Sequence, residues 1–163
     1  MLIKIAGAAL AGLLVVASAS MAEEAHQLSR GQTVYVPVYS EVLHGNLDSS
    51  GNPSRMPLSA MLSIRNTDPA HRIEIDSVRY YDGSGKPLRA FLGQPKQLEP
   101  LQSTEMFVEH KDMTGGTGAS FLVVWSSGAP VNPPVIEAVH AYFFGNQSTA
   151  FISPGRAITS TGK

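Results

Sequence analysis

The closest pair of soft metal ligands in the sequence is His110 with Met113. An imidazole nitrogen and a thioether sulfur are a ligand combination that copper accepts. Copper needs at least one further ligand, which a histidine or methionine elsewhere in the chain would have to supply: His44, Met56, Met61 or Met106. Copper binding at His110 and Met113 is therefore one hypothesis, and solvated loop and core side chains are the ordinary alternative.

Glu137 is a carboxylate inside an otherwise apolar run, Val135 to Phe144 (VIEAVHAYFF). A charge that is buried without a partner is strongly destabilising, so Glu137 should face water or meet a cation. Arg65 and Arg79 lie on expected core strands, and we predict a buried ion pair between Glu137 and Arg65. A catalytic acid with a raised pKa is the alternative, but no second carboxylate in the same strand supports it.

A glycine-dense segment runs from Asp112 to Gly118 (DMTGGTG). Glycines let backbone N–H groups approach an anion closely, but the Walker spacing is absent and a strand rather than a helix follows. A turn that requires positive φ explains the glycines equally well. We interpret the segment as a candidate interaction loop, formed by Asp112, Gly115, Gly116 and Gly118.

Catalytic signatures are missing from the sequence. It contains no G-x-S-x-G and no H-E-x-x-H motif, and its five histidines are scattered without metal-ligand spacing. We therefore expect a protein that is not an enzyme and that has no cofactor, with copper as the alternative stated above.

Short alternating runs indicate the elements that must position these residues. Gln32 to Tyr39 alternates as a strand, which Pro37 should make an edge or bulged strand. Leu58 to Arg65 is a half-buried strand, and Phe121 to Trp125 is apolar on both faces, as in a covered central strand. Val135 to Phe144 also fits a helical stripe, but its β-branched and aromatic content favours a strand.

Turn signals separate these runs. Ser40 to Pro57 is expected to be a long polar loop, and Asp82 to Lys86 closes a hairpin. The alternation changes phase near Asp76 and Ser77, which indicates a β-bulge. About eight or nine strands with a turn roughly every ten residues predict an all-β, two-sheet antiparallel sandwich of immunoglobulin-like type, with a small β-barrel as the alternative.

The N-terminus has the features of an export signal. Lys4 precedes a segment, Ile5 to Ala22, that carries no charge and ends in small residues. A retained anchor is the alternative, but the apolar part is short for a bilayer. The predicted organisation is a signal peptide, a flexible mature N-terminus, a β-sandwich domain and a disordered tail, at 1–22, 23–31, 32–158 and 159–163.

Charge and cysteine content restrict location and partners. The net charge is −1 and no basic cluster is present, which argues against nucleic acid as a partner. The chain has no cysteine, so disulfides and lipid attachment at a cysteine are excluded. We expect a periplasmic protein with no membrane anchor after signal cleavage.

Four stretches of the sequence carry a resemblance to a known family. They are Leu62 to Pro69 (LSIRNTDP), Tyr80 to Leu88 (YYDGSGKPL), Asp112 to Trp125 with its glycines, and Ile136 to Val139 (IEAV). Over roughly Gln32 to Ile158 the chain resembles a bacterial exported family catalogued as domain of unknown function 3124. The resemblance implies an envelope location and carries over no functional residues.

These observations favour a non-catalytic binding or accessory module of the cell envelope, whose partner is an envelope protein or a glycan. If this is correct, the loop from Ser40 to Pro57 and the glycine loop should lie at one end of the molecule. The alternative is a periplasmic copper-binding protein that uses His110 and Met113.

Overall fold

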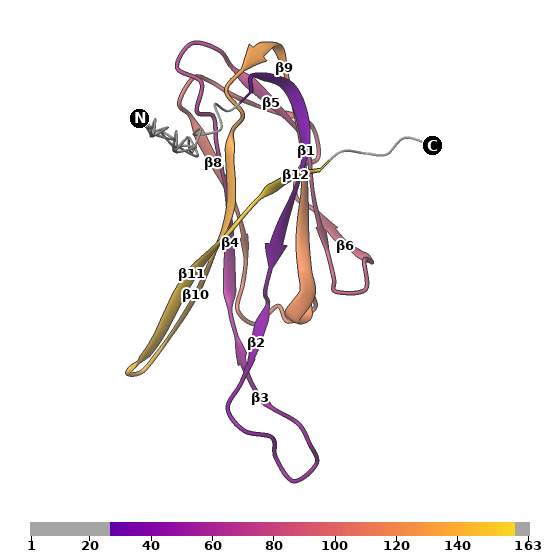
Figure 1. Ribbon diagram of the computed structural model, residues 1–163, viewed down its shortest axis with the longest axis vertical. Coiled ribbons are helices and arrows are strands. Elements are labelled where there is room, and N and C mark those ends of the chain that lie inside the picture. Colours follow the sequence, from indigo (N-terminus) through magenta and orange to yellow (C-terminus); the bar gives the residue numbers. More distant parts are fainter. Residues whose placement is uncertain (1–26, 159–163) are drawn as a thin grey trace, which may run out of the picture.

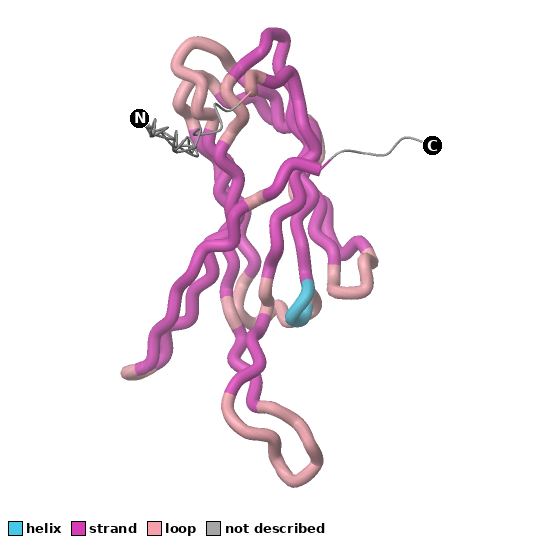
Figure 2. The backbone as a smooth tube through the Cα atoms, in the orientation of Figure 1, coloured by secondary structure: helices cyan, strands magenta, loops and turns pink. Residues whose placement is uncertain are grey.

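The computed structural model describes residues 27–158, and it is an all-β protein (Figures 1 and 2). Within this part the one helical element is a single 3₁₀ turn, η1 (Gly116–Gly118), and no helix is long and apolar enough to cross a membrane. The strands are β1 (Ser29–Val38), β2 (Glu41–His44), β3 (Ser54–Pro57), β4 (Ser59–Arg65), β5 (Ile73–Tyr81), β6 (Pro87–Ala90), β7 (Lys96–Leu98), β8 (Ser103–Val108), β9 (Ala119–Val131), β10 (Val135–Phe144), β11 (Gln147–Pro154) and β12 (Arg156–Ile158).

The strands form two packed antiparallel sheets and a separate ribbon. One sheet has six strands in the order β12-β1-β9-β5-β6, with β7 also paired to β5. The second has four strands in the order β11-β10-β4-β8, and β2 pairs only with β3. No strand pair in residues 27–158 joins the two large sheets, so the barrel alternative is wrong and the expectation of packed antiparallel sheets is confirmed.

Alternate residues of both sheets point inward and form one hydrophobic core. In β1 the inward residues are Val34, Val36 and Val38, and in β4 they are Ala60, Leu62 and Ile64. The largest fully buried side chains are Trp125, Tyr80 and Phe121. Period-two alternation is what a sheet covered on one face requires, and it is why the sequence pattern indicated strands correctly.

Two local expectations are confirmed by the strand register. The pairing of β5 with β9 shifts between Ile75 and Ser77, which is the predicted bulge. Val135–Phe144 is strand β10, paired on both sides with β4 and β11, so the helical alternative is wrong.

Three other expectations need correction. Strand β1 lies between β12 and β9 rather than at an edge, and Pro37 is tolerated because β12 pairs only with residues 33–35. The segment from Ser40 to Pro57 is not one long loop, because β2 and β3 pair within it as a ribbon. Strand β9 is central, but Leu122 and Val124 on its outer face are only half-buried.

The C-terminal strands tie the two sheets together. Strand β11 belongs to the four-stranded sheet, and after Pro154 the chain crosses to pair as β12 with β1 in the other sheet. The Gly155 N–H donates a hydrogen bond to the Ile136 carbonyl at 2.8 Å during this crossing. Strand β1 begins at Ser29, three residues before the predicted domain start, whereas the predicted signal peptide (1–22) and tail (159–163) lie outside the described residues.

Candidate functional site: the loop end of the molecule

Several connections lie toward one end of the sandwich, which we call the loop end: the β2–β3 ribbon, the glycine loop (112–118), the β5–β6 turn (82–86) and, projecting to one side, the tip of the β10–β11 hairpin (Figure 1). The Ser40 N–H donates to the Gly116 carbonyl at 2.9 Å, which fixes the ribbon against the glycine loop. Figure 1 shows the β2–β3 ribbon and the β10–β11 hairpin projecting beyond the two sheets at this end. The expectation that the two loops share one end is therefore confirmed.

The glycine loop is built into the fold at Gly115. This residue is buried, and a Cβ there would overlap the Tyr80 hydroxyl and lie 2.6 Å from Ser40 Oγ. Those two oxygens are hydrogen-bonded to each other at 2.7 Å, and burial raises the pKa of Tyr80 above its usual value. Gly116 has a φ of +67°, which favours glycine.

The other predicted loop residues shape the loop from outside. Asp112 Oδ1 accepts hydrogen bonds from the Thr114 N–H and hydroxyl, and Gly118 lies against Gly83 of the β5–β6 turn. The 3₁₀ turn has only three residues, so no helix N-terminus is available for an anion, as the sequence indicated.

A cleft of about 440 Å³ lies between the ribbon, the glycine loop and the β5–β6 turn. Its charged lining residues are Glu41 and Arg55 from the ribbon and Asp82 from the turn. Ser84 and Lys86 donate hydrogen bonds to Asp82, which hold the pKa of its carboxyl below the usual value. The cleft is therefore walled by two acidic side chains, one basic side chain and glycine-rich backbone.

Glu41 is the unusual residue of this cleft. Its side chain is 5% exposed, and its Oε1 accepts a hydrogen bond at 2.5 Å from Arg55, whose side chain is 61% exposed. Its second oxygen, Oε2, is buried and has no hydrogen-bond partner. A buried polar atom without a partner is costly, and such atoms are uncommon in folded proteins.

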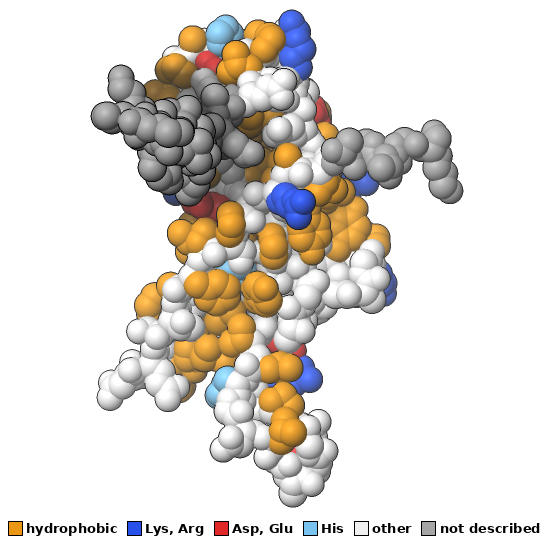
Figure 3. Space-filling model, in the orientation of Figure 1, with side chains coloured by type: hydrophobic (Ala, Val, Ile, Leu, Met, Phe, Trp, Pro, Cys, Tyr) orange, Lys and Arg blue, Asp and Glu red, His pale blue; other side chains and the backbone are white. Residues whose placement is uncertain are grey.

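The β10–β11 hairpin presents apolar side chains to solvent. Phe143 and Phe144, just before its turn, are each 75% exposed. Neighbouring residues of a strand point to opposite faces, so the hairpin tip is uncovered on both faces. Residues 138–155 contain no Asp, Glu, Lys or Arg. Leu43 and Leu47 of the ribbon are also exposed, and Figure 3 shows hydrophobic side chains gathered on both projections.

An apolar row crosses the outer face of the four-stranded sheet behind this hairpin. The strand register places Ile152 opposite Val139, Val139 opposite Met61, and Met61 opposite Phe107. Ile152 and Phe107 are exposed, and the two residues between them are half-buried. The row continues the apolar surface of the hairpin across all four strands.

His140 fixes the root of the hairpin. It is fully buried, stacks on Phe151 with a centroid distance of 4.6 Å, and accepts a hydrogen bond from the Tyr39 N–H at Nε2. Burial lowers the pKa of His140, and Nδ1 has no partner that satisfies hydrogen-bond geometry. The imidazole is thus a neutral structural group rather than an exposed ligand.

At the opposite end, a polar network that we call the corner joins the β4–β5, β7–β8 and β9–β10 connections. Asn66 Nδ2 donates to the carbonyls of His71, Leu98 and Glu99. Asp68 accepts hydrogen bonds from the backbone of Ala70, His71 and Asn132 and from the Asn132 side chain: these bonds hold the pKa of the Asp68 carboxyl far below its usual value. The corner is fully satisfied within the chain.

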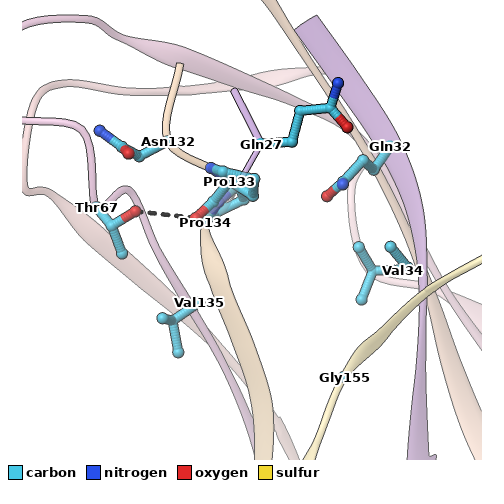
Figure 4. A pocket seen from close by; sticks show the side chains of 10 residues that line it. Gln27, Gln32, Val34, Thr67, Asn132, Pro133, Pro134, Val135 and Gly155 are labelled. Atoms are coloured by element: carbon cyan, nitrogen blue, oxygen red, sulfur yellow. Dashed lines mark hydrogen bonds between the residues drawn. The ribbon is translucent and has the colours of Figure 1, made fainter. Parts of the chain in front are cut away.

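A second cleft, of about 1000 Å³, opens beside the corner between β1 and the β9–β10 connection (Figure 4). In it the Thr67 hydroxyl donates to the Pro133 carbonyl at 2.9 Å. None of the residues that line it is charged: Gln27, Gln32, Val34, Thr67, Asn132, Pro133, Pro134, Val135, Gly155 and Ala157. Among the described residues, the lining of this larger cleft is thus polar and apolar but uncharged.

The structure places the residues of the copper hypothesis as follows. Met113 belongs to the glycine loop and His110 lies two residues before it, and both are exposed. The candidate third ligands lie in other elements: His44 in β2, Met56 in β3, Met61 in β4 and Met106, which is buried, in β8. Within residues 27–158 no group of three or more His, Cys, Asp or Glu side chains is arranged to hold a metal ion.

The predicted buried pair of Glu137 and Arg65 is not formed. Glu137 pairs in register with Ser63, and Arg65 with Val135, so the two side chains are diagonal neighbours on the outer face of the sheet. Glu137 is half-buried and Arg65 is exposed, and Arg65 Nε donates to Ser63 Oγ instead. No salt bridge joins them in the described part of the chain.

Sequence reasoning missed Glu41 and His140. Glu41 lay in a segment interpreted as a polar loop, where a carboxylate is unremarkable. The segment from Glu41 to His44 (EVLH) does not alternate, so no local signal indicated its burial. For His140 the signal was its parity, because residues 136, 138 and 140 of a strand point to the same face and Ile136 and Ala138 are apolar.

Comparison with known proteins gives a family and no function. A crystal structure titled Thermotoga maritima 1070 is similar in part, with 13% identity, a TM-score of 0.41, and coverage of 77% of this chain and 92% of that one. No curated protein matches. The family model described as "Protein of unknown function (DUF3124)" matches residues 31–158, as the sequence resemblance predicted. The chain therefore belongs to the DUF3124 family.

Proposed function

We propose that this protein is a non-catalytic binding module of the cell envelope, exported by its N-terminal segment, that holds a protein partner at the loop end. The observation that carries the proposal is the β10–β11 hairpin, whose tip exposes Phe143 and Phe144 on opposite faces. Exposed aromatic side chains that the protein itself leaves uncovered are typical of interaction sites.

The charge distribution supports a protein rather than a glycan as the partner. The hairpin has no charged residue between 138 and 155, so covering it would desolvate no ion. A hairpin that is apolar on both faces fits a groove that encloses it, which a folded protein can supply. The exposed Leu43 and Leu47 of the ribbon extend the same surface.

The fold supports a scaffold role by analogy. Immunoglobulin-like sandwiches present binding loops at one end of two packed sheets, and we propose the same use here. The two clefts add no catalytic arrangement, since one is uncharged and the other has only Glu41, Arg55 and Asp82 as charged groups.

Affinity capture from crosslinked envelope fractions tests the proposal. The double substitution Phe143→Ser with Phe144→Ser should reduce capture of a discrete partner at least about tenfold, because buried aromatic side chains dominate interface energies. The matched control is Leu101→Asn, which alters a side chain that is 69% exposed at the other end. Equal capture by wild type and the double variant would contradict the proposal.

A further inference from the structure

The buried carboxylate of Glu41 has one satisfied oxygen and one free oxygen. Arg55 donates to Oε1, whereas Oε2 has no donor and the residue is 4% exposed. A carboxylate removed from water needs donors on both oxygens to offset its desolvation. Among residues 27–158, no group donates a hydrogen bond to Oε2.

The surroundings of Glu41 favour a cationic donor. Asp82 lines the same cleft and is held in its ionised form by the donors from Ser84 and Lys86. Two carboxylates thus line the same cleft as one guanidinium, and the Arg55 side chain is mostly in solvent. The remaining wall is Leu43, small polar side chains and the backbone of residues 114–118, which leaves room for a slender group.

The geometry of the free acceptor discriminates between cations. A guanidinium forms its strongest pairs with both oxygens of one carboxylate, but Oε1 is already taken by Arg55. An ammonium is a point charge on a flexible stem and needs a single acceptor. A divalent metal would need further ligands, and no group of three suitable side chains occurs in residues 27–158.

We propose that the cleft between the ribbon and the glycine loop binds a primary ammonium group, carried by a lysine side chain of the protein partner, with Glu41 Oε2 as its acceptor. This inference rests on the proposed function and deepens it by naming the chemistry of the partner. The ammonium approaches Oε2 from the cleft while Arg55 keeps its hydrogen bond to Oε1, and the hairpin tip supplies apolar contact to the same partner.

The experiment uses the exported chain without its signal segment and a defined probe, N-acetyl-lysine methylamide, followed through the backbone amide signals of residues 114–118. The probe should cause saturable shifts there, and its ε-acetylated form, which has no charge, should cause none. Glu41→Gln should weaken probe binding at least about tenfold, since hydrogen bonds to a charged group are the stronger class.

Two further variants keep the result interpretable. Glu109→Gln is the matched control, because Glu109 pairs with Lys111 at 2.7 Å on the surface outside the cleft, and it should bind the probe as wild type does. Arg55→Gln removes the neighbouring cation, which repels an ammonium, and should strengthen probe binding severalfold, even if Glu41→Gln fails to fold. Absence of saturable shifts, equal binding by Glu41→Gln, or weaker binding by Arg55→Gln would overturn the inference.

The outcomes separate this inference from the proposed function. If the probe fails to bind while the Phe143→Ser, Phe144→Ser variant loses the partner, the ammonium site is wrong and the binding module stands. If that double variant captures the partner normally, the proposed function is wrong, whatever the probe does.

Discussion

Two carboxylates of nearly equal burial lie at opposite ends of the molecule and have different surroundings. Asp68, in the corner, is 5% exposed and accepts hydrogen bonds from three backbone N–H groups and two side chains. Glu41, at the loop end, is 4% exposed and has Arg55 as the one donor to its side chain among the described residues. The corner carboxylate is thus held by several donors, whereas one oxygen of the Glu41 carboxylate has no donor among residues 27–158.

The corner and the loop end also differ in how many apolar side chains they expose. At the corner, Asn66 joins the β4–β5 connection to the β7–β8 connection, and Asp68 joins it to the β9–β10 connection. At the loop end, two hairpins project and expose Phe143, Phe144, Leu43 and Leu47. Substitutions in the corner should therefore change stability, and substitutions on the projecting hairpins should change binding.

The largest loss of stability should come from Asn66→Ala. This change leaves buried carbonyls and the Asp68 N–H without their side-chain partners, and each unsatisfied group costs about 1–3 kcal/mol. We expect the free energy of unfolding to fall by about 3 kcal/mol or more in urea denaturation. Asn146→Ala, at the exposed hairpin turn, should change it by less than about 0.5 kcal/mol. Equal effects of the two changes would remove the contrast between the ends.

Gly115→Ala should have the next largest effect. Its Cβ would overlap the Tyr80 hydroxyl and press on Ser40 Oγ and Ala119, and forced overpacking costs about 1–3 kcal/mol. The control Gly128→Ala adds a methyl group that meets nothing within 4 Å. Thermal unfolding should show a clear drop in Tm for Gly115→Ala and almost none for Gly128→Ala, and a tolerated Gly115→Ala would show that the glycine loop is not held by the core.

As the pH falls, His140 and Asp68 should lower the free energy of unfolding over different pH ranges. Burial lowers the pKa of His140 below its ordinary 6.5, so the unfolded chain binds the proton first and stability should decline as pH falls from 6.5 toward the folded pKa. Asp68 has a folded pKa below its ordinary 3.8, so its contribution is present above about pH 4 and is lost below it. Urea denaturation measured across pH checks this. His140→Phe should remove most of the decline in the free energy of unfolding that begins near pH 6.5, and it should leave the decline below about pH 4 as in wild type. If the decline that begins near pH 6.5 is the same in His140→Phe, the assignment to His140 is wrong.

The smallest effect on stability is expected at the hairpin tip. Phe143→Ser and Phe144→Ser alter side chains that are mostly in solvent already, so together they should shift the free energy of unfolding by less than about 1 kcal/mol. A large destabilisation would mean that these aromatic side chains belong to the fold rather than to a binding surface. Chemical denaturation beside wild type checks this before any binding assay.

Sequence patterns were sufficient for the sheets and insufficient for the site. The strands and the bulge could be predicted because apolar and polar residues alternate along a strand as its buried and exposed faces do. Examples are the alternation of Val34, Val36 and Val38 and the phase change near Ser77. The pairing of Glu41 with Arg55 and the stacking of His140 on Phe151 depend on the β2–β3 and β10–β11 registers. No local pattern encodes those registers.

The expected Glu137–Arg65 pair failed for a related reason. Both residues were placed correctly on strands, but the register sets them diagonally on an outer face, where water solvates both charges. The segment 112–118 was correctly placed in a loop because glycine clusters have a direct conformational cause, and its role in an interaction stays a prediction. The packing of Gly115 against Tyr80 could be seen only in three dimensions.

The central claim, that the loop end and not the corner meets a protein partner, is tested most directly by a photoactivatable phenylalanine analogue placed at Phe144 or at Leu101. Both side chains are strongly exposed, and they lie at opposite ends. On irradiation of envelope preparations, the account predicts one discrete crosslinked adduct from position 144 and none from position 101. The same adducts from both positions, or an adduct from position 101 alone, would contradict it.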